Sequence, residues 1–315
     1  MVSNFFVGLE GFFFLLMYFI DFICILFLSV LFLKSLFKNI LTAMKKVICL
    51  LFLSLTASSF AAVPALEREV LLELYHSTNG YHWKNKWNLA APVATWYGVT
   101  VLEDKVVGLD LSDNNLSGAL PESIGNLSSL KKINFCNNRI EGAIPKTIGN
   151  LTALTHLNLS HNQLSGVIPS SIGNLLNLVH IELFMNKLKG SLPFELGKLS
   201  KLEVLSIYNN EIEGKIPVSL YTMQSLKVML LSGNRLNGEL RSDIVKLKDL
   251  ETLSLFDNEL KGLIPKELEA LKKLRELNIS YNQFNGPVSK NLVDKDALNL
   301  TMLTSKGKVV LFETI

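Results

Sequence analysis

The chain has 315 residues, of which 49% are hydrophobic and 19% are charged, and its mean hydropathy is +0.31. The apolar residues concentrate at the N-terminus, where 12 of the 18 Phe precede residue 62. Beyond residue 61 the chain carries 27 basic and 26 acidic residues, and this balance gives no electrostatic case for binding nucleic acid or an anionic membrane surface. Only one of the three Cys lies beyond residue 61, which excludes a disulfide framework or a thiolate metal site there.

Two apolar runs, residues 11–33 and 47–62, open the chain and are separated by a connector that contains Lys. The second run has the features of a signal peptide. It follows Met44-Lys45-Lys46, its apolar stretch is short, and Ser59-Phe60-Ala61 supplies small residues at the cleavage positions. Residues 44–61 are therefore predicted to be a signal peptide that is cleaved after Ala61.

Residues 1–43 have two interpretations. If translation starts at Met44, they are an extension that the mature protein lacks. Alternatively, the first apolar run is a transmembrane segment, because its length suffices to cross about 30 Å of hydrocarbon. Either way, everything after residue 62 is predicted to lie outside the cytoplasm, as a secreted, periplasmic or cell-surface protein or as a membrane-anchored protein with the rest of the chain outside.

An Asn recurs at an unbroken spacing of 24 residues through most of the chain. Four residues after each Asn stands a Gly, and two further on stands an aliphatic residue that is usually followed by Pro. Self-similarity at a fixed period is the signature of a solenoid, in which stacked units bury a shared core. The recurring residues are Asn114, Asn138, Asn162, Asn186, Asn210, Asn234, Asn258 and Asn282.

Each column of the repeat has a physical interpretation. The alternation around Leu157 and Leu159 predicts a short strand, and the strands of stacked units form a parallel sheet. An inward Asn after the strand can donate and accept backbone hydrogen bonds at the corner. The Gly suits a backbone position with φ above zero. If the recurring Asn residues bond in this way, Asn162→Leu should lower the free energy of unfolding by several kcal/mol. Asn115→Leu, next to a recurring Asn but not one of them, should leave stability nearly unchanged.

The motif Leu-x-x-Leu-x-Leu-x-x-Asn-x-Leu-x-Gly-x-Ile-Pro, at residues 154–169, resembles the plant-type leucine-rich repeat. That family includes ectodomains of plant receptor-like kinases, polygalacturonase-inhibiting proteins and short secreted proteins of bacteria and protists. The resemblance covers residues 106–288. It implies an α/β solenoid, a horseshoe with a parallel concave β-sheet, eight repeats and terminal caps, and a binding rather than catalytic role.

Residues 62–105 are predicted to form the N-terminal cap. They contain a stretch with helical spacing, in which Val70, Leu71 and Leu74 share one face, and all the Trp residues of the chain. Residues 96–100 resemble the Trp-x-Gly-Val signature of the plant-type cap, but Ala94 and Val101 stand where that cap has Cys. The cysteine-free cap favours the bacterial or protist branch. Residues 289–315 are predicted to be a C-terminal cap.

No sequence motif for catalysis is present, so the protein is predicted not to be an enzyme and to use no cofactor. Three His residues, at positions 156, 161 and 180, invite comparison with metal ligands. No Cys or carboxylate cluster completes a tetrahedral set around them, and no metal site is predicted.

The concave face is the predicted ligand-binding surface. Strand residues that flank the buried aliphatics form columns along the solenoid, and three aromatic residues cluster in one column that is otherwise mostly Ser. In the alternative interpretation, these rings lie flat and merely cover the strands. Cys136 occupies the same column, and a chance replacement of Ser is favoured over pairing between chains. The tentative binding residues are His156, His161, His180, Glu182, Phe184, Met185, Tyr208, Leu230 and Phe256.

The resulting hypothesis is a non-catalytic extracytoplasmic recognition module that binds a protein or polysaccharide through its concave face. One alternative is a membrane-anchored receptor-like ectodomain or adhesin without its own signalling domain. Another is an inhibitor of a secreted glycoside hydrolase, which rests on the family resemblance alone.

Overall fold

A computed structural model describes residues 63–285 and 290–293, together with isolated positions before residue 63. The chain divides into two units, Met1–Phe60 and Ala61–Ile315, and the second contains all the elements discussed below. The predicted signal peptide, the extension before it and most of the predicted C-terminal cap lie outside the described residues. Within the described part of the chain, no helix combines the length and the apolar character needed to cross a membrane.

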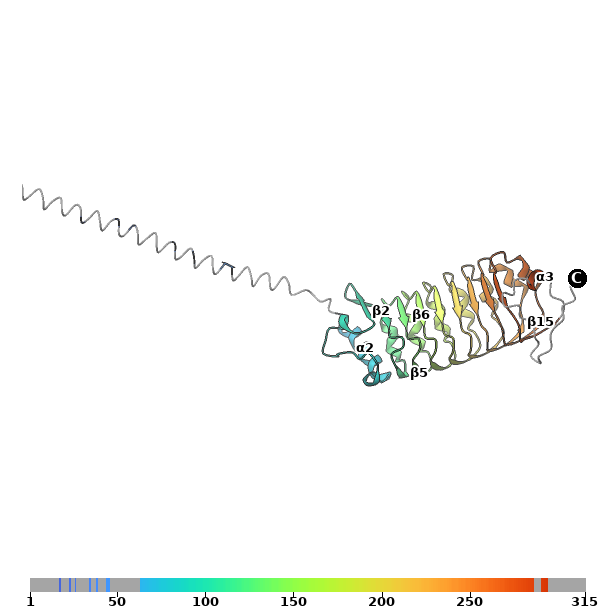
Figure 1. Ribbon diagram of the computed structural model, residues 1–315, viewed down its shortest axis with the longest axis horizontal. Helices are drawn as coiled ribbons and strands as arrows, with labels where there is room; N and C mark the ends of the chain where they lie inside the picture. Colours follow the sequence, from blue (N-terminus) through green and yellow to red (C-terminus); the bar gives the residue numbers. More distant parts are fainter. Residues whose placement is uncertain are drawn as a thin grey trace, which may run out of the picture. The chain divides into compact units, whose positions relative to one another are not determined.

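The repeats stack their first strands into one sheet, which runs the length of the solenoid (Figure 1). Within residues 63–285 this first sheet has nine strands, all parallel except for the hairpin that β1 makes with β2. The strands, in spatial order, are β1 (Val99–Leu102), β2 (Lys105–Asp110), β4 (Lys132–Asn134), β6 (His156–Asn158), β8 (His180–Glu182), β10 (Val204–Ser206), β12 (Val228–Leu230), β14 (Thr252–Ser254) and β16 (Glu276–Asn278).

A second parallel sheet, not anticipated from the sequence, lies on the returning segments of the same repeats. Its strands are β3 (Ser117–Ala119), β5 (Arg139–Gly142), β7 (Gln163–Gly166), β9 (Lys187–Gly190), β11 (Glu211–Gly214), β13 (Arg235–Glu239), β15 (Glu259–Leu263) and β17 (Gln283–Asn285). A Gly with positive φ lies in this strand in each repeat from Gly118 to Gly262, which confirms the predicted role of the Gly column.

Short 3₁₀ helices lie between the second strand of most repeats and the first strand of the next, and two more lie in the N-terminal cap. They are η1 (Gly80–His82), η2 (Val93–Thr95), η3 (Glu122–Asn126), η4 (Lys146–Asn150), η5 (Ser170–Asn174), η6 (Phe194–Lys198), η7 (Val218–Thr222), η8 (Ser242–Lys246) and η9 (Lys266–Ala270). The α-helices α2 (Ala65–Ser77) and α3 (Lys290–Val293) lie at the two ends of the described chain. The repeat aliphatics form one continuous core, and Leu154, Leu157 and Leu159 are fully buried within it.

The recurring Asn side chains tie each repeat to the one before it. Asn162 donates from Nδ2 to the carbonyl oxygens of Leu159 and Ser160 in its own repeat and of Phe135 in the preceding repeat, at 2.9–3.1 Å. Its Oδ1 accepts the N–H of Ile140 at 2.9 Å. Each of these Asn thus satisfies backbone groups that would otherwise be buried without partners. The same donor and acceptor pattern holds for Asn138, Asn186, Asn210, Asn234, Asn258 and Asn282.

The residue before each of these Asn adopts a left-handed backbone conformation. The eight positions are Asp113, Asn137, His161, Met185, Asn209, Gly233, Asp257 and Tyr281, with φ between 50° and 60°. Asn115, on the other side of Asn114, is also left-handed, with φ of 61°, and donates to the carbonyl of His82 at 2.9 Å. The expectation that Asn115→Leu is silent is therefore wrong, because the change removes a contact to the cap and places Leu in a strained conformation.

Helix α2 covers the open end of the first repeat, and Val70, Leu71 and Leu74 are buried there, as their spacing predicted. Gly98 has φ of +73°, and a Cβ at this position would lie 2.0 Å from the carbonyl oxygen of Asp110. The Gly of the cap signature is thus required both for its backbone conformation and for close approach to β2.

The three Trp of the cap form a buried aromatic cluster with Tyr75. Trp83 packs edge-on against Trp87 at a centroid distance of 4.9 Å, and Trp87 stacks on Trp96 at 4.7 Å. Each indole N–H donates to a backbone carbonyl, so these large rings are buried without an orphaned donor.

Candidate functional site

The concave face is defined here as the solvent-facing side chains of the first sheet and of the residues that follow each strand. These side chains form three columns, exemplified in one repeat by His156, Asn158 and Ser160. Strand pairing is in register from β4 to β16, so residues 24 apart lie side by side along each column. The strands therefore convert the 24-residue spacing into a continuous surface.

The N-terminal part of the concave face is polar. The ammonium group of Lys132 lies 3.6 Å from the carboxylate of Asp110, and Asn134 donates to the same carboxylate at 3.0 Å. Burial alone would raise the pKa of Asp110, but hydrogen bonds from Ser112 and Asn134 and the charge of Lys132 outweigh it and lower the pKa. Sequence reasoning missed this cluster because its residue types are common on exposed strands.

His156 and His180 are neighbours on β6 and β8, with ring centroids 4.7 Å apart in an edge-on arrangement. Burial lowers the pKa of His156, and the charges of His180 and Lys132 lower it further, whereas the carboxylate of Glu182 acts in the opposite direction. His161 lies apart from this pair, against the ring of Phe184. Among the residues that the structure describes, no three His, Cys, Asp or Glu side chains are grouped to hold a metal ion.

Phe184 and Tyr208 form a stacked pair in the third column. Their ring centroids are 4.4 Å apart, and their planes differ by 9°. Two parallel rings this close must stack face to face, because their atoms would overlap if the rings lay side by side in one plane. Burial raises the pKa of Tyr208, and the charges of Glu182 and Cys136 raise it further, so its hydroxyl lies toward the preceding repeats. His161 packs edge-on against Phe184 at 5.1 Å.

Phe256, in the same column, belongs to a separate pair. Its ring lies 5.0 Å from that of Tyr281, at an angle of 64°. Ser232 lies between Tyr208 and Phe256 in the column, so the predicted patch divides into two ring groups. Tyr281 was not predicted from the sequence, although it occupies the same left-handed turn position as the predicted His161 and Met185.

A hollow of about 330 Å³ opens on the concave face over β14 and β16. Leu230, which was predicted from the sequence, lines it together with Thr252, Leu253, Ser254, Glu276, Leu277 and Asn278. The hydroxyl groups of Ser232 and Ser254 are 2.6 Å apart, so Ser232 connects the third column to the wall of the hollow. The remaining predicted residues are the exposed Met185 at a turn and the half-buried Glu182, which accepts a hydrogen bond from Asn158.

Cys136 is half-buried and accepts a hydrogen bond from the hydroxyl of Ser160 at 3.2 Å. It is a free thiol on the concave face.

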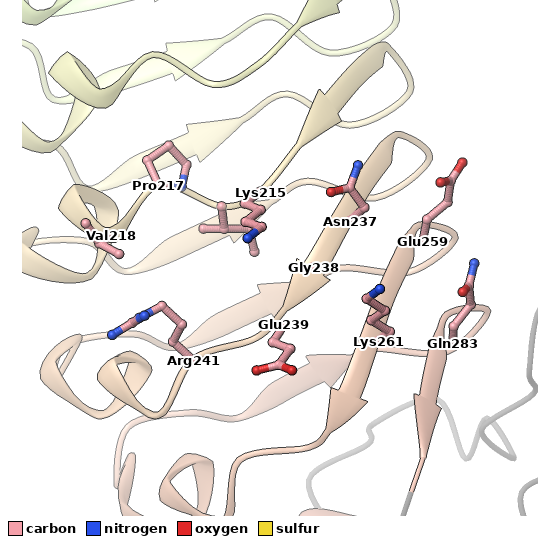
Figure 2. Close-up of a pocket in the computed structure, with 11 residues that line it drawn as sticks. Lys215, Pro217, Val218, Asn237, Gly238, Glu239, Arg241, Glu259, Lys261 and Gln283 are labelled. Carbon is pink, nitrogen blue, oxygen red and sulfur yellow. The ribbon is translucent and has the colours of Figure 1, made fainter.

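A separate groove of about 840 Å³ lies on the second sheet (Figure 2). Its lining mixes both charge signs: Lys215, Ile216, Pro217, Val218, Asn237, Gly238, Glu239, Arg241, Glu259, Lys261 and Gln283. Gly238 forms part of its floor, and a Cβ there would lie 2.9 Å from Cγ of Lys215. The groove contains no aromatic side chain and is distinct from the concave face.

Family models identify the repeats. The model described as "Leucine-rich repeat region" matches residues 170–305, and the model described as "Leucine rich repeat" matches residues 105–164 and 129–188. Together with the stacked parallel strands, these matches make the chain a leucine-rich-repeat protein with a solenoid fold.

Solved structures share this fold. The ectodomain of the Arabidopsis thaliana membrane receptor kinase GASSHO1/SCHENGEN3, in complex with CASPARIAN STRIP INTEGRITY FACTOR 2, is 28% identical over 72% of the chain, with a TM-score of 0.67. The plant peptide hormone receptor RGFR1, in complex with RGF2, is 34% identical over 61% of the chain, with a TM-score of 0.58. A leucine-rich-repeat protein of Leptospira interrogans is 36% identical over 61% of the chain, with a TM-score of 0.52. The chain spans 28%, 30% and 47% of these structures, respectively.

Proposed function

We propose that the protein is an exported, non-catalytic recognition module that binds a protein or peptide through its concave face. The observation that carries the proposal is the cluster of aromatic rings on the concave face, which comprises the stacked Phe184 and Tyr208 with His161 and the pair of Phe256 and Tyr281. Aromatic anchors are typical of binding hot spots. The receptor structures in complex with CASPARIAN STRIP INTEGRITY FACTOR 2 and RGF2 support this kind of role.

The repeat length and the cap favour a particular type of leucine-rich-repeat protein. The 24-residue period matches the plant type, whereas the cap of residues 62–105 lacks the Cys pair of plant receptors. Similarity to the Leptospira interrogans protein supports a bacterial-type form. A start at Ala62 in the native, exported protein would support cleavage of the signal peptide, and a start at Met1 in the membrane fraction would support an anchored receptor instead.

The test begins with a displayed peptide library selected on the wild-type protein. Selected peptides are then measured against a triple variant, Phe184→Ser, Tyr208→Ser and Phe256→Ser. We expect affinity to fall more than about tenfold, which corresponds to about 1.4 kcal/mol. A matched triple variant, Val167→Ser, Leu176→Ser and Leu263→Ser, removes exposed apolar side chains away from the first sheet and should bind normally. Equal binding by the concave-face variant and the wild type would refute the proposed surface.

A further inference from the structure

The concave face changes character along the solenoid. On the N-terminal strands the solvent-facing residues include Asp110, Lys132 and Glu182, whereas on β10, β12, β14 and β16 they are mostly apolar or carry a hydroxyl. Among the eight strand residues on this side of those four strands, only Glu276 is charged. The eight residues are Val204, Ser206, Val228, Leu230, Thr252, Ser254, Glu276 and Asn278.

The hollow of about 330 Å³ arises from the sizes of these side chains. On β14 the lining side chains that face solvent are Thr252 and Ser254, which are both small. Leu230 lies on β12, and Glu276 and Asn278 lie on β16. In-register pairing places the three strands side by side. β14 therefore forms a low floor between an apolar wall on β12 and a polar wall on β16.

The carboxylate of Glu276 is turned toward this floor. Its Oε2 accepts a hydrogen bond from the hydroxyl of Thr252 at 3.3 Å, across one strand step. Since Thr252 belongs to the lining of the hollow, the bond draws the carboxylate over β14 rather than over the far side of β16. The other carboxylate oxygen, Oε1, accepts no hydrogen bond from the residues that the structure describes.

This carboxylate has no cation partner within the described part of the chain. Two other carboxylates of the first sheet or its margin have one, since Asp110 lies 3.6 Å from Lys132. Likewise, Glu203 lies 2.8 Å from Lys227. Glu276 takes part in none of the ion pairs found among the described residues. A carboxylate that faces an apolar wall is less screened by water than one on an open surface, so it attracts a cation more strongly.

Lys and Arg side chains match the shape and the chemistry of the hollow. Each has an apolar stem that packs along apolar surface while its charged head remains at a polar edge. A volume of about 330 Å³ lies at the lower end of the range for ligand pockets, which favours one side chain over a larger ligand. The stem would contact Leu230, and the head would reach the free oxygen of Glu276.

We propose that the hollow over β14 and β16 is a cation site that binds one Lys or Arg side chain of a peptide partner, with Glu276 as the counter-ion. This inference rests on the proposed function and specifies its chemistry. Val204, Val228 and Leu230 precede the hollow along the sheet. The cation of the partner therefore adjoins an apolar segment that lies over β10 and β12.

The direct test compares two small probes. N-acetyl-L-lysine N-methylamide carries the cation, and N-acetyl-L-norleucine N-methylamide has a similar stem without it. Binding of each probe is measured by chemical-shift titration of the protein. Glu276→Gln removes the negative charge with little change of shape, and Ser254→Leu fills the floor with a side chain that the same column already carries at position 230. The matched control, Glu141→Gln, removes an exposed carboxylate from β5 of the second sheet.

We expect the wild type and Glu141→Gln to bind the lysine probe saturably and at least about threefold more tightly than the norleucine probe, as a partly exposed ion pair allows. Glu276→Gln should bind the two probes equally, and Ser254→Leu should bind neither. Absence of saturable binding of the lysine probe to the wild type, or an unchanged preference in Glu276→Gln, would overturn the cation site. Unchanged binding by folded Ser254→Leu would do the same, and if that variant does not fold, Glu276→Gln decides alone.

The peptides selected for the proposed function separate the two ideas. Peptides that lose affinity for the triple Ser variant but bind Glu276→Gln normally would refute the cation site and leave the concave face as the binding surface. Peptides that are unaffected by the triple variant would refute the concave face itself. A selected Lys or Arg whose replacement by norleucine weakens binding to the wild type, but not to Glu276→Gln, supports the cation site.

Discussion

At the scale of single residues, the corner after each strand of the first sheet depends on two side-by-side positions. The recurring Asn satisfies buried backbone groups of two repeats, and the residue before it turns the chain through a left-handed conformation. At this second position His161, Met185 and Tyr281 replace the Asn, Asp or Gly that adopt the conformation with less strain. Their side chains thereby project beside the concave face.

Asn162→Leu should lower the free energy of unfolding by about 2–5 kcal/mol, because it leaves one N–H and several carbonyl groups without their partner in mid-stack. Asn126→Leu is the appropriate control, since Asn126 is exposed at the end of η3 and should change stability by about 0.5 kcal/mol or less. Urea unfolding measures both. Equal losses for the two variants would contradict the ladder.

His156 should make the protein sensitive to mild acid. Its pKa is lowered in the folded state by burial, so the unfolded chain takes up the proton first as the pH falls. The corresponding stability is complete above the unfolded pKa of about 6.5 and is lost as the pH falls from there toward the lower folded pKa. His156→Asn should therefore lose less stability than the wild type between pH 7.5 and 5 in urea titrations, with His82→Asn as the control for losing an exposed imidazole. A loss equal to that of the wild type would exclude this role.

At the scale of elements, the cap and the first strands meet at a contact that admits only Gly. Gly98→Ala should destabilise the protein strongly, because its Cβ would overlap the carbonyl of Asp110 in addition to the strain of positive φ. Gly142→Ala shares the positive φ of +77°, but its nearest neighbour would be Cβ of Ala119 at an ordinary 3.5 Å, so its cost should be about 1 kcal/mol. Thermal melting compares the two, and similar melting temperatures would argue against the close approach.

The elements also show what the sequence could and could not predict. The strand, the Asn position and the Gly with positive φ follow from a strict period, since the Asn and the Gly recur with one residue type and the strand with buried aliphatic or Met residues at fixed positions. The left-handed turn position carries six residue types, which hides it from pattern reading. The aromatic column was visible in the sequence, but whether its rings stand or lie flat depends on contacts between repeats.

At the scale of the whole molecule, stability should depend little on salt. In seven of the eight ion pairs found within residues 63–285, both side chains are at least 24% exposed, and in the eighth Glu67 is buried. Exposed pairs contribute about 0–1 kcal/mol each and are screened by salt. The melting temperature should therefore shift by only about a few degrees between low and molar NaCl. A large drop would indicate that electrostatics, rather than the continuous aliphatic core, holds the repeats together.

The regular step of the first sheet also selects the conformation of any chain that lies along it. A β-strand presents side chains on one side about every 6.7 Å, which is incommensurate with a step of about 4.8 Å. A polyproline II helix presents one side chain per turn, about every 9.3 Å, which nearly equals two steps. Successive side chains on one side of a proline-rich ligand would thus contact equivalent positions on alternate repeats. Those of a β-strand would lose this match to the repeat spacing within a few residues.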